Sequence, residues 1–354
     1  MCVENRAPID EVVGAPVVYV DANFVISPEH QGEDRIFPRF AHMDAMHEAA
    51  KRTKPSPLAD PVPLTNWNHR PYRPPDYGAE WVMLRKAWSL SRNGKTKLSE
   101  NQIAAASAEF YPPGHALENL ENWIWRFTSL LCTPEYTPLF DDGIDAFEPL
   151  RGSPLWDYFN RFYDGDASAR GKRYYELMKD FFGGYSEFSQ VYFLVVQGMP
   201  IRERYHTTST DFDAVEMFYG KAYEQFTFLI EYLAMLNNML GGRPYDTFQK
   251  LTLTKYRKLD RPQRFGPFET NTAFMAMCAE ADNQLRNASH HSSFVFDRSN
   301  QMISYRIGKG GTGAEHRISY ANYLERCVRL FLQAMTLLRL ELLISTSKGI
   351  RRPV

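Results

Sequence analysis

Apolar residues recur at helical spacing along most of the chain from residue 77 onward. The longest such pattern covers residues 215–240, where Gly241-Gly242 ends it, and another covers residues 323–342 near the end of the chain. The last pattern is not wholly apolar, because Glu341 falls on its apolar side. Together these patterns predict a mostly α-helical protein.

Residues 77–205 form a predicted helical region that is rich in aromatic side chains. Proline and glycine residues separate its segments, at Pro112-Pro113-Gly114, Pro134, Pro138, Gly152-Ser153-Pro154 and Gly183-Gly184. One stripe has the composition of a base-stacking surface: Trp156, Tyr158, Phe159, Phe162 and Tyr163. Aromatic residues at helical spacing usually face a partner helix, so the pattern favours packing in a core.

The first 76 residues contain too many prolines for long helices or central strands. Seven of them lie close together, at Pro55, Pro57, Pro61, Pro63, Pro71, Pro74 and Pro75. Such a segment is expected to run extended over the surface of the rest of the protein. The sequence therefore predicts three regions: a proline-rich arm (1–76), a helical region (77–205) and a second helical region (206–354).

A basic segment, residues 255–265, follows the longest helical pattern. Five cationic residues stand there against Asp260, with an aromatic residue toward each end: Lys255, Arg257, Lys258, Arg261 and Arg264. This composition suits contact with phosphates and stacking on bases. A solvated loop explains it equally well.

Two strand-like runs lie at residues 294–296 and 302–307, separated by turn residues at 297–300. They predict a β-hairpin. The glycine-rich stretch 308–313 predicts a flexible hairpin tip, and Ile318-Ser319-Tyr320 leads into the last helix.

The best clue to function is the polar run Arg286-Asn287-Ala288-Ser289-His290-His291, at the end of a helical pattern that begins near Gly266-Pro267. A guanidinium can hold a phosphate, and an imidazole can transfer a proton near neutral pH. Residues five apart on a continuous helix point about 140° away from each other. Either the helix ends inside this run, or Arg286 and His291 serve different faces.

These residues resemble the R-N-x-x-x-H form of the R-x4-6-H motif of the HEPN superfamily, a group of helical bundles that includes many metal-independent ribonucleases. The order that follows is similar to that of prokaryotic defence and toxin members: motif, short β-hairpin, and a C-terminal helix that begins with Ser319 and Tyr320. The resemblance implies a HEPN-like helical bundle over about residues 210–345, with the hairpin before its last helix.

The resemblance also implies a site and a reaction. His291 would act as the general acid or base, Arg286 would stabilise charge on the phosphate, and Asn287 would position the reacting groups. His290 and Asp282 are possible supporting residues. The implied activity is RNA cleavage by 2′-hydroxyl attack, which leaves 2′,3′-cyclic phosphate and 5′-hydroxyl ends and uses no metal and no cofactor. The basic segment would bind the RNA.

Because the motif occurs once, the resemblance implies a homodimer in which two motifs face each other. The resemblance also implies that the protein acts in antiviral defence or in a toxin–antitoxin system, with an antitoxin or another defence protein as a possible partner. Ser293 stands where some toxins of the superfamily have a tyrosine, so silencing by modification of that tyrosine is not expected. The alternatives are a HEPN-like module that binds RNA or protein without cleavage, and a helical scaffold unrelated to the superfamily.

Charge and composition narrow the picture further. The 354 residues carry a formal net charge of −1, so any contact with RNA must come from a local patch. The four cysteines are scattered without C-x-x-C spacing, which predicts reduced thiols and no zinc site. No apolar run reaches about 18 residues and no signal-peptide pattern opens the chain, so the sequence predicts a cytoplasmic protein without membrane contact.

Overall fold

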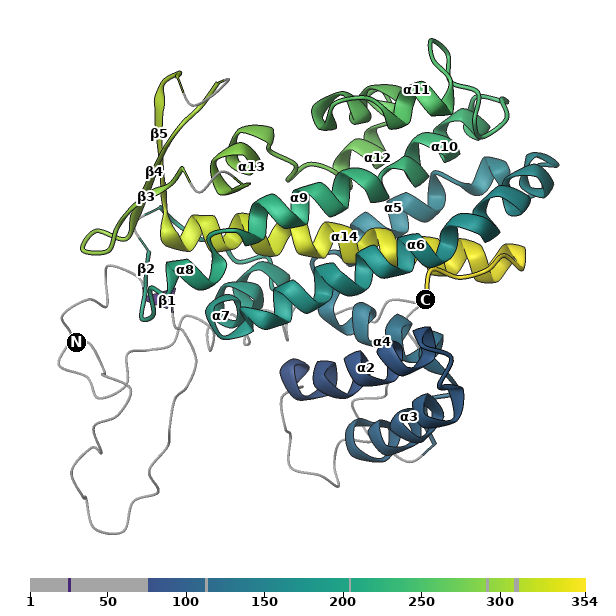
Figure 1. Cartoon of the computed structure of the whole chain (residues 1–354), viewed down its shortest axis with the longest axis horizontal. Coiled ribbons are helices and arrows are strands. Elements are labelled where there is room, and N and C mark those ends of the chain that lie inside the picture. Colours follow the sequence, from purple (N-terminus) through teal and green to yellow (C-terminus); the bar gives the residue numbers. More distant parts are fainter. Residues whose placement is uncertain (1–24, 27–75, 112–113, 204, 291–292, 309–311) are drawn as a thin grey trace. The chain divides into compact units, whose positions relative to one another are not determined.

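The computed structural model describes residues 25–26, 76–111, 114–203, 205–290, 293–308 and 312–354. These residues form thirteen α-helices and a small three-stranded antiparallel sheet that precedes the long C-terminal helix (Figure 1). The prediction of a mostly α-helical protein is confirmed. The predicted proline-rich arm lies outside the described residues, except for residues 25–26 and Asp76.

The described residues divide into two compact units whose segments alternate along the sequence. Unit 1 takes its residues from Met1–Thr53, Gly184–Gly220 and Gln284–Arg329, and unit 2 takes its residues from Lys54–Gly183, Lys221–Asn283 and Leu330–Val354. The helices α9 and α14 contribute residues to both units. The consecutive division of the chain near residues 76 and 205 stays a prediction.

The helices of unit 2 are α2 (Tyr77–Arg92), α3 (Thr96–Phe110), α4 (Leu120–Cys132), α5 (Thr137–Asp145), η3 (Glu148–Leu150), α6 (Leu155–Gly183), α10 (Glu231–Leu240), α11 (Leu253–Arg257), η4 (Arg261–Phe268) and α12 (Thr272–Ala276), together with parts of α9 (Phe218–Leu229) and α14 (Tyr320–Lys348). Aromatic side chains build much of the core. Trp88 and Trp123 are fully buried, and Phe181 stacks on Phe331 with ring centroids 3.8 Å apart. Each such buried side chain contributes about 1.5–3 kcal/mol relative to an exposed one.

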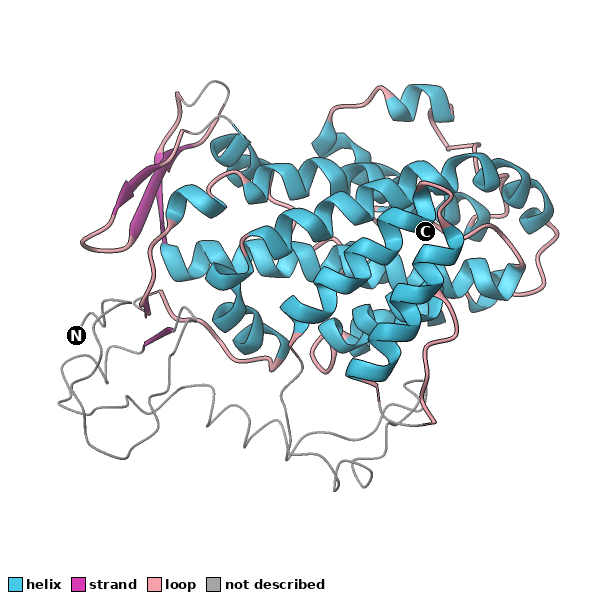
Figure 2. Ribbon diagram, turned by 60° about the horizontal axis from the view of Figure 1, so that its bottom comes forward, coloured by secondary structure: helices cyan, strands magenta, loops and turns pink. Residues whose placement is uncertain are grey.

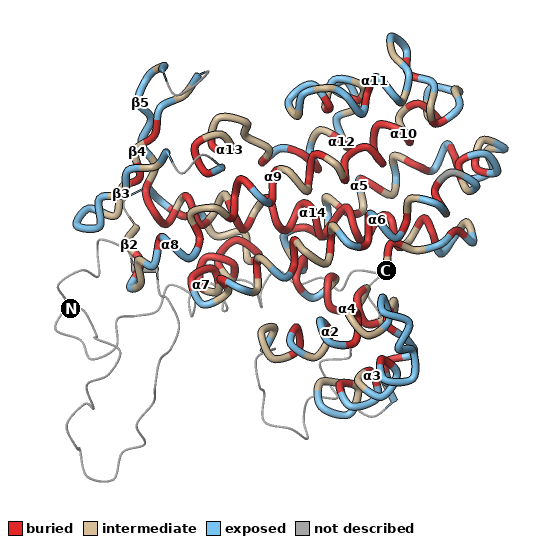
Figure 3. The backbone as a smooth tube through the Cα atoms, in the orientation of Figure 1, coloured by how far each residue is buried: buried red, intermediate tan, exposed pale blue. Residues whose placement is uncertain are grey.

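The predicted aromatic stripe on α6 is mostly core. Trp156, Phe159 and Tyr163 are buried, which confirms the prediction for these three, whereas Tyr158 is 54% exposed. The side chain of Phe162 lies outside the described atoms. In Figure 3 the buried positions of α6 alternate with exposed ones, as expected of a helix with one face in a core.

Unit 2 also buries a carboxyl group whose hydrogen bonds in the described structure come from neutral donors. Glu80 on α2 is 4% exposed, and its Oε1 atom accepts hydrogen bonds of 2.8 Å from the Trp123 indole and from the Tyr111 hydroxyl. Burial raises the pKa of Glu80, and the two hydrogen bonds offset this only in part. The folded protein therefore holds a proton on Glu80 at a pH where the unfolded chain has lost it.

This raised pKa predicts a dependence of stability on pH. The contribution of Glu80 is fully present below its ordinary pKa of 4.5 and is lost as the pH rises through the folded-state value. A Glu80→Gln variant keeps an acceptor for both donors but cannot ionise. We expect the free energy of unfolding of the wild type, relative to this variant, to fall as the pH rises from 4 toward 8. Urea unfolding across that range measures the difference, and a constant difference would contradict the assignment.

Unit 1 contains α7 (Tyr185–Val196), α8 (Phe212–Val215), α13 (Asn283–His290, apart from Asn283), and five strands: β1 (Val25–Ile26), β2 (His206–Thr207), β3 (Val295–Asp297), β4 (Met302–Arg306) and β5 (Glu315–Ser319). The order of the three-stranded sheet is β3-β4-β5, and both pairs are antiparallel (Figure 2). The predicted hairpin is thus confirmed as β3-β4. The sequence reading missed β5, which pairs Ser319 with Met302 and Ile318 with Ile303.

The turn between β3 and β4 forms as its residues predict. The Asp297 carboxylate accepts hydrogen bonds from the backbone N–H and hydroxyl of Ser299 and from the side chain of Asn300. These bonds lower the pKa of Asp297 to about 2. The last helix, α14, begins directly after β5, and Ser319 accepts a hydrogen bond of 3.2 Å from the backbone N–H of Asn322. No helix in the described part of the chain is long and apolar enough to cross a membrane.

The continuous helix predicted over residues 215–240 is wrong, because the chain forms α8, α9 and α10 there. At the first break the Ser289 hydroxyl accepts a hydrogen bond of 3.0 Å from the Gly220 N–H and donates one of 2.6 Å to the Glu216 carbonyl. An unbroken helix would join those two backbone groups directly. A side chain inserted into the helical hydrogen-bond ladder is a known cause of such breaks.

The single helix predicted from Gly266-Pro267 to the motif is also wrong. The chain forms η4, α12 and α13 instead, and Pro267 lies inside the 3₁₀ segment. Asn271 then starts a new helix, because its side chain accepts a hydrogen bond of 3.2 Å from the Phe274 N–H. The motif therefore sits on a short helix of its own.

Candidate active site at the end of α13

Arg286 and Asn287 lie in the middle of α13 and are both half-buried. The Arg286 guanidinium donates a hydrogen bond of 2.7 Å from Nη1 to the Asn287 side-chain oxygen. This bond restricts the plane of a group that is well suited to hold a phosphate. The two predicted residues are therefore in contact.

One histidine of the motif lies at the end of the described part of α13. His290 is exposed and is the last residue of that helix, four residues after Arg286 and so on the same helical face. The two alternatives derived from the spacing of Arg286 and His291 both stay predictions. His291 lies outside the described residues. Asp282 is half-buried and precedes the helix.

Ser289 and Gly220 fix the end of α13 against the start of α9. Besides its two hydrogen bonds to the backbone at the helix break, Ser289 is fully buried. The Tyr323 hydroxyl donates a further hydrogen bond of 2.7 Å to the Glu216 carbonyl. A Cβ atom on Gly220 would lie 2.9 Å from the backbone nitrogen of His290, closer than real Cβ contacts allow. Glycine is required there because the two backbones approach so closely.

A pair of glycine substitutions tests this contact. Gly220→Ala should destabilise the protein by about 1–3 kcal/mol, because the added methyl group meets backbone that cannot move freely. Gly165→Ala is the matched control, since Gly165 is an exposed glycine within α6 and its Cβ would have no neighbour within 4 Å. That change should stabilise by about 0.5–1 kcal/mol. Urea unfolding compares the two, and equal effects would contradict the close approach.

Two backbone groups tie α13 to the chain that follows it. The Ser293 N–H donates a hydrogen bond of 3.0 Å to the Ala288 carbonyl, which satisfies an acceptor at the C-terminal end of the helix. The Gly308 N–H, just after β4, donates one of 2.8 Å to the Gln284 side chain at the start of the helix. The motif helix and the sheet are therefore held together at both ends of α13.

Within the described residues, no group of three or more His, Cys, Asp or Glu side chains could hold a metal ion. Cys132, Cys278 and Cys327 are buried and form no disulfide, in agreement with the predicted reduced thiols. Comparisons of the chain with known protein families, with curated proteins and with solved structures find no match. The resemblance to the HEPN superfamily stays a prediction from the sequence.

The basic segment is a pair of short helices, α11 and η4, and its cations differ in their surroundings. Lys255 and Lys258 are exposed. Arg257 forms an ion pair of 2.6 Å with Glu231, whose hydrogen bonds and charge raise the pKa of Arg257 despite partial burial. The segment belongs to unit 2, whereas Arg286 belongs to unit 1.

Arg264 is the buried cation of the basic segment. It is 1% exposed, and it donates hydrogen bonds to the carbonyls of Thr227 and Arg257 at the C-terminal ends of α9 and α11. A cation at these ends is favourable because the unsatisfied carbonyls carry partial negative charge. That Arg264 contacts the backbone of RNA stays a prediction, and the hydrogen bonds of its side chain in the described structure go to backbone carbonyls of the protein.

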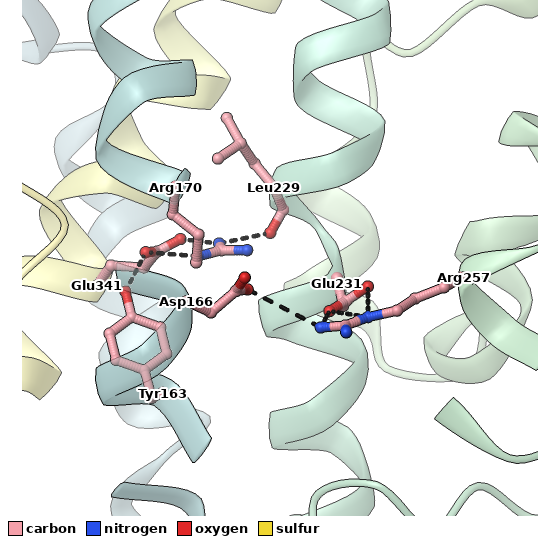
Figure 4. Close-up of polar contacts among 7 residues, drawn as sticks. All are labelled: Tyr163, Asp166, Arg170, Leu229, Glu231, Arg257 and Glu341. Carbon is pink, nitrogen blue, oxygen red and sulfur yellow. Dashed lines mark hydrogen bonds and ion pairs between the residues drawn. The ribbon is translucent and has the colours of Figure 1, made fainter. Parts of the chain in front are cut away.

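Sequence reasoning missed a buried ion pair in unit 2 (Figure 4). Glu341 on α14 is fully buried and accepts hydrogen bonds from the Arg170 guanidinium on α6 and from the hydroxyl of Tyr163. Arg170 also donates a hydrogen bond of 2.8 Å to the carbonyl of Leu229, where α9 ends and α10 begins. The position of Glu341 on the apolar side of the last helical pattern was the one available sign of this pair.

Proposed function

We propose that the protein is a metal-independent endoribonuclease whose site contains Arg286, Asn287 and His291. The observation that carries the proposal is the contact between Arg286 and Asn287 on α13, where the guanidinium donates a hydrogen bond of 2.7 Å to the amide oxygen. This bond orients a group that is well suited to hold a phosphate. The contact between Arg286 and Asn287 and the burial of Ser289 support a built site.

The order of elements gives further support. The motif helix α13 is followed by β3-β4-β5 and then by α14, in agreement with the order expected of prokaryotic HEPN proteins. In this proposal residues 206–354 form a HEPN-like helical domain, in which α9, α10, α13 and α14 are the principal helices. The sheet inserted before α14 would be the counterpart of the expected hairpin.

The proposed reaction is an internal transfer at phosphorus. His291 removes the proton from a ribose 2′-hydroxyl, or gives a proton to the departing 5′-oxygen. The 2′-oxygen forms a bond to phosphorus as the bond to the 5′-oxygen breaks, which leaves a 2′,3′-cyclic phosphate and a 5′-hydroxyl. Arg286 neutralises the charge that builds on the phosphate oxygens in between, and Asn287 holds the guanidinium in place.

The proposal includes a homodimer in which two copies of the motif meet at one RNA strand, with an antitoxin or another defence protein as regulator. Its experiment is an RNA cleavage assay with excess chelator present. We expect RNA to be cut, DNA to resist because it lacks the 2′-hydroxyl, and the products to carry cyclic phosphate ends. RNA binding without cleavage would instead favour the non-catalytic module, and cleavage that needs Mg²⁺ would contradict the mechanism.

A further inference from the structure

Three arginine side chains of unit 2 surround the ring of Phe228 in the last turn of α9. The guanidinium carbon lies 3.8 Å from the ring centroid for Arg173 on α6, and 4.2 Å and 4.7 Å for Arg261 and Arg264 on η4. Guanidinium groups stack on aromatic rings through cation–π attraction. The ring therefore fixes the positions of three cations, and we call Arg173, Phe228, Arg261 and Arg264 the Phe228 cluster.

The cluster holds more positive charge than its partners neutralise. Arg261 donates a hydrogen bond of 2.8 Å to Glu224, the only carboxylate in the described part of the chain that forms an ion pair with the cluster. Arg173 donates one of 3.0 Å to the neutral amide of Gln225. The bonds of Arg264 go to neutral backbone carbonyls. Three guanidinium groups thus share one carboxylate.

Arg264 is deeply buried within this excess of positive charge. Its side chain is 1% exposed, yet its Nε atom forms no hydrogen bond with any described residue. A buried donor without an acceptor costs free energy, and proteins leave few such groups. The cluster therefore offers a hydrogen-bond donor that lacks an acceptor, and it lies beside positive charge that its ion pair does not fully neutralise.

Repulsion among the guanidinium groups also favours a bound anion. Burial lowers the pKa of Arg173, and the nearby charges of Arg170, Arg261 and Arg264 lower it further, with Asp166 acting against them. Burial also lowers the pKa of Arg264 and the charge of Arg261 lowers it further, with Tyr256, Glu231 and Glu224 acting against them. An anion placed among these groups would relieve the repulsion and supply acceptors.

We propose that the Phe228 cluster is a binding site for a phosphate group. Arg173 and Arg261 are half-buried, so an anion from solution can reach their planar forks, which match phosphate oxygens well. The guanidinium groups occupy the ring of Phe228, so the site recognises the phosphate and does not stack a base. The phosphate comes either from a small phosphomonoester or from the backbone of RNA. The inference rests on this cluster alone and stands whether or not the proposed ribonuclease activity does.

Thermal unfolding of the full chain tests the site, because a ligand that binds only the folded state raises Tm. Inorganic phosphate should raise Tm of the wild type above its value in sodium chloride of equal ionic strength. Arg173→Gln and Arg261→Gln should each weaken this effect by about tenfold in phosphate concentration, as expected for a lost charge-assisted fork. Lys172→Gln is the matched control, because it removes one exposed charge next to Arg173 and should change nothing.

Two further probes identify the source of the phosphate. Adenosine monophosphate that stabilises the wild type indicates a small phosphomonoester, whereas binding of a 2′-O-methylated RNA oligonucleotide alone indicates backbone phosphate. Arg173→Lys keeps the charge but loses the fork, and it should bind weakly even if a glutamine variant fails to fold. The proposal is overturned if the arginine variants respond to phosphate and RNA as Lys172→Gln does. No RNA cleavage enters these readouts, so a failed ribonuclease assay leaves the inference intact.

Discussion

Replacing His291 with alanine should slow RNA cleavage by about a hundredfold to ten-thousandfold, the usual loss when a general acid or base is removed. His291 follows Arg286 at the spacing of the motif on which the proposed function rests. Alanine can neither accept the 2′-hydroxyl proton nor donate one to the 5′-oxygen. Single-turnover rates on a defined RNA, measured with excess chelator, give the size of the loss.

His290→Ala is the matched control, since it removes the neighbouring imidazole from the exposed end of α13. It should cost little in rate. Circular dichroism and thermal unfolding must show that both variants fold. Loss of cleavage in His290→Ala with full activity in His291→Ala would mean that the motif has been assigned to the wrong histidine.

The sequence predicted where helices occur and where glycine or proline ends them, but not the breaks inside residues 215–240. Local periodicity reports which face of a helix is apolar, and it found the α9–α10 region and α14 for that reason. The breaks come from side chains far away in the sequence. Ser289 inserts between Gly220 and Glu216, and Arg170 donates to the carbonyl at Leu229. No pattern within residues 215–240 records either contact.

The three-stranded sheet was also predicted only in part from local sequence. Residues 294–307 carry their own turn chemistry at Asp297, so the hairpin could be found locally. The third strand, β5, is mostly exposed and polar, and its pairing with β4 spans a glycine-rich connection. It lacks the apolar alternation by which a half-buried strand is recognised.

For the candidate site, residue type alone could not separate binding from packing. Lys255 is exposed and Arg264 is buried, although both are cations of the same basic segment. The difference depends on Phe228 and on the helix ends that Arg264 caps, which lie elsewhere in the sequence. Arg173 could not be singled out from the sequence, because its neighbours on α6 form no motif.

Glu341 and Arg170 illustrate a buried pair whose two halves depend on each other. Glu341 accepts hydrogen bonds from Arg170, Tyr163 and Tyr174 and has no exposed surface. Burial lowers the pKa of Arg170, but the charge of Glu341 and the hydrogen bonds to it raise that pKa by more, so the guanidinium is charged in the folded protein. Burial and the charge of Glu341 raise the pKa of Tyr163, which keeps its hydroxyl as a donor.

Arg170→Met should therefore destabilise the protein by about 3–5 kcal/mol, because it leaves the Glu341 carboxylate buried without a cation. The same change also removes the donor to the Leu229 carbonyl. Urea unfolding followed by tryptophan fluorescence measures the loss. Lys179→Met on the same helix is the control, since its ion pair with Glu176 is 48% and 36% exposed and should contribute less than about 1 kcal/mol.

The double variant Arg170→Met with Glu341→Leu separates charge burial from simple loss of packing. If the cost of Arg170→Met arises from an unpaired carboxylate, removing that carboxylate should restore part of the lost stability, so the double variant is more stable than Arg170→Met alone. The recovery should be incomplete, because the hydroxyls of Tyr163 and Tyr174 lose their acceptor. Additive losses would show instead that Arg170 and Glu341 stabilise unit 2 independently, through the volume that each side chain fills.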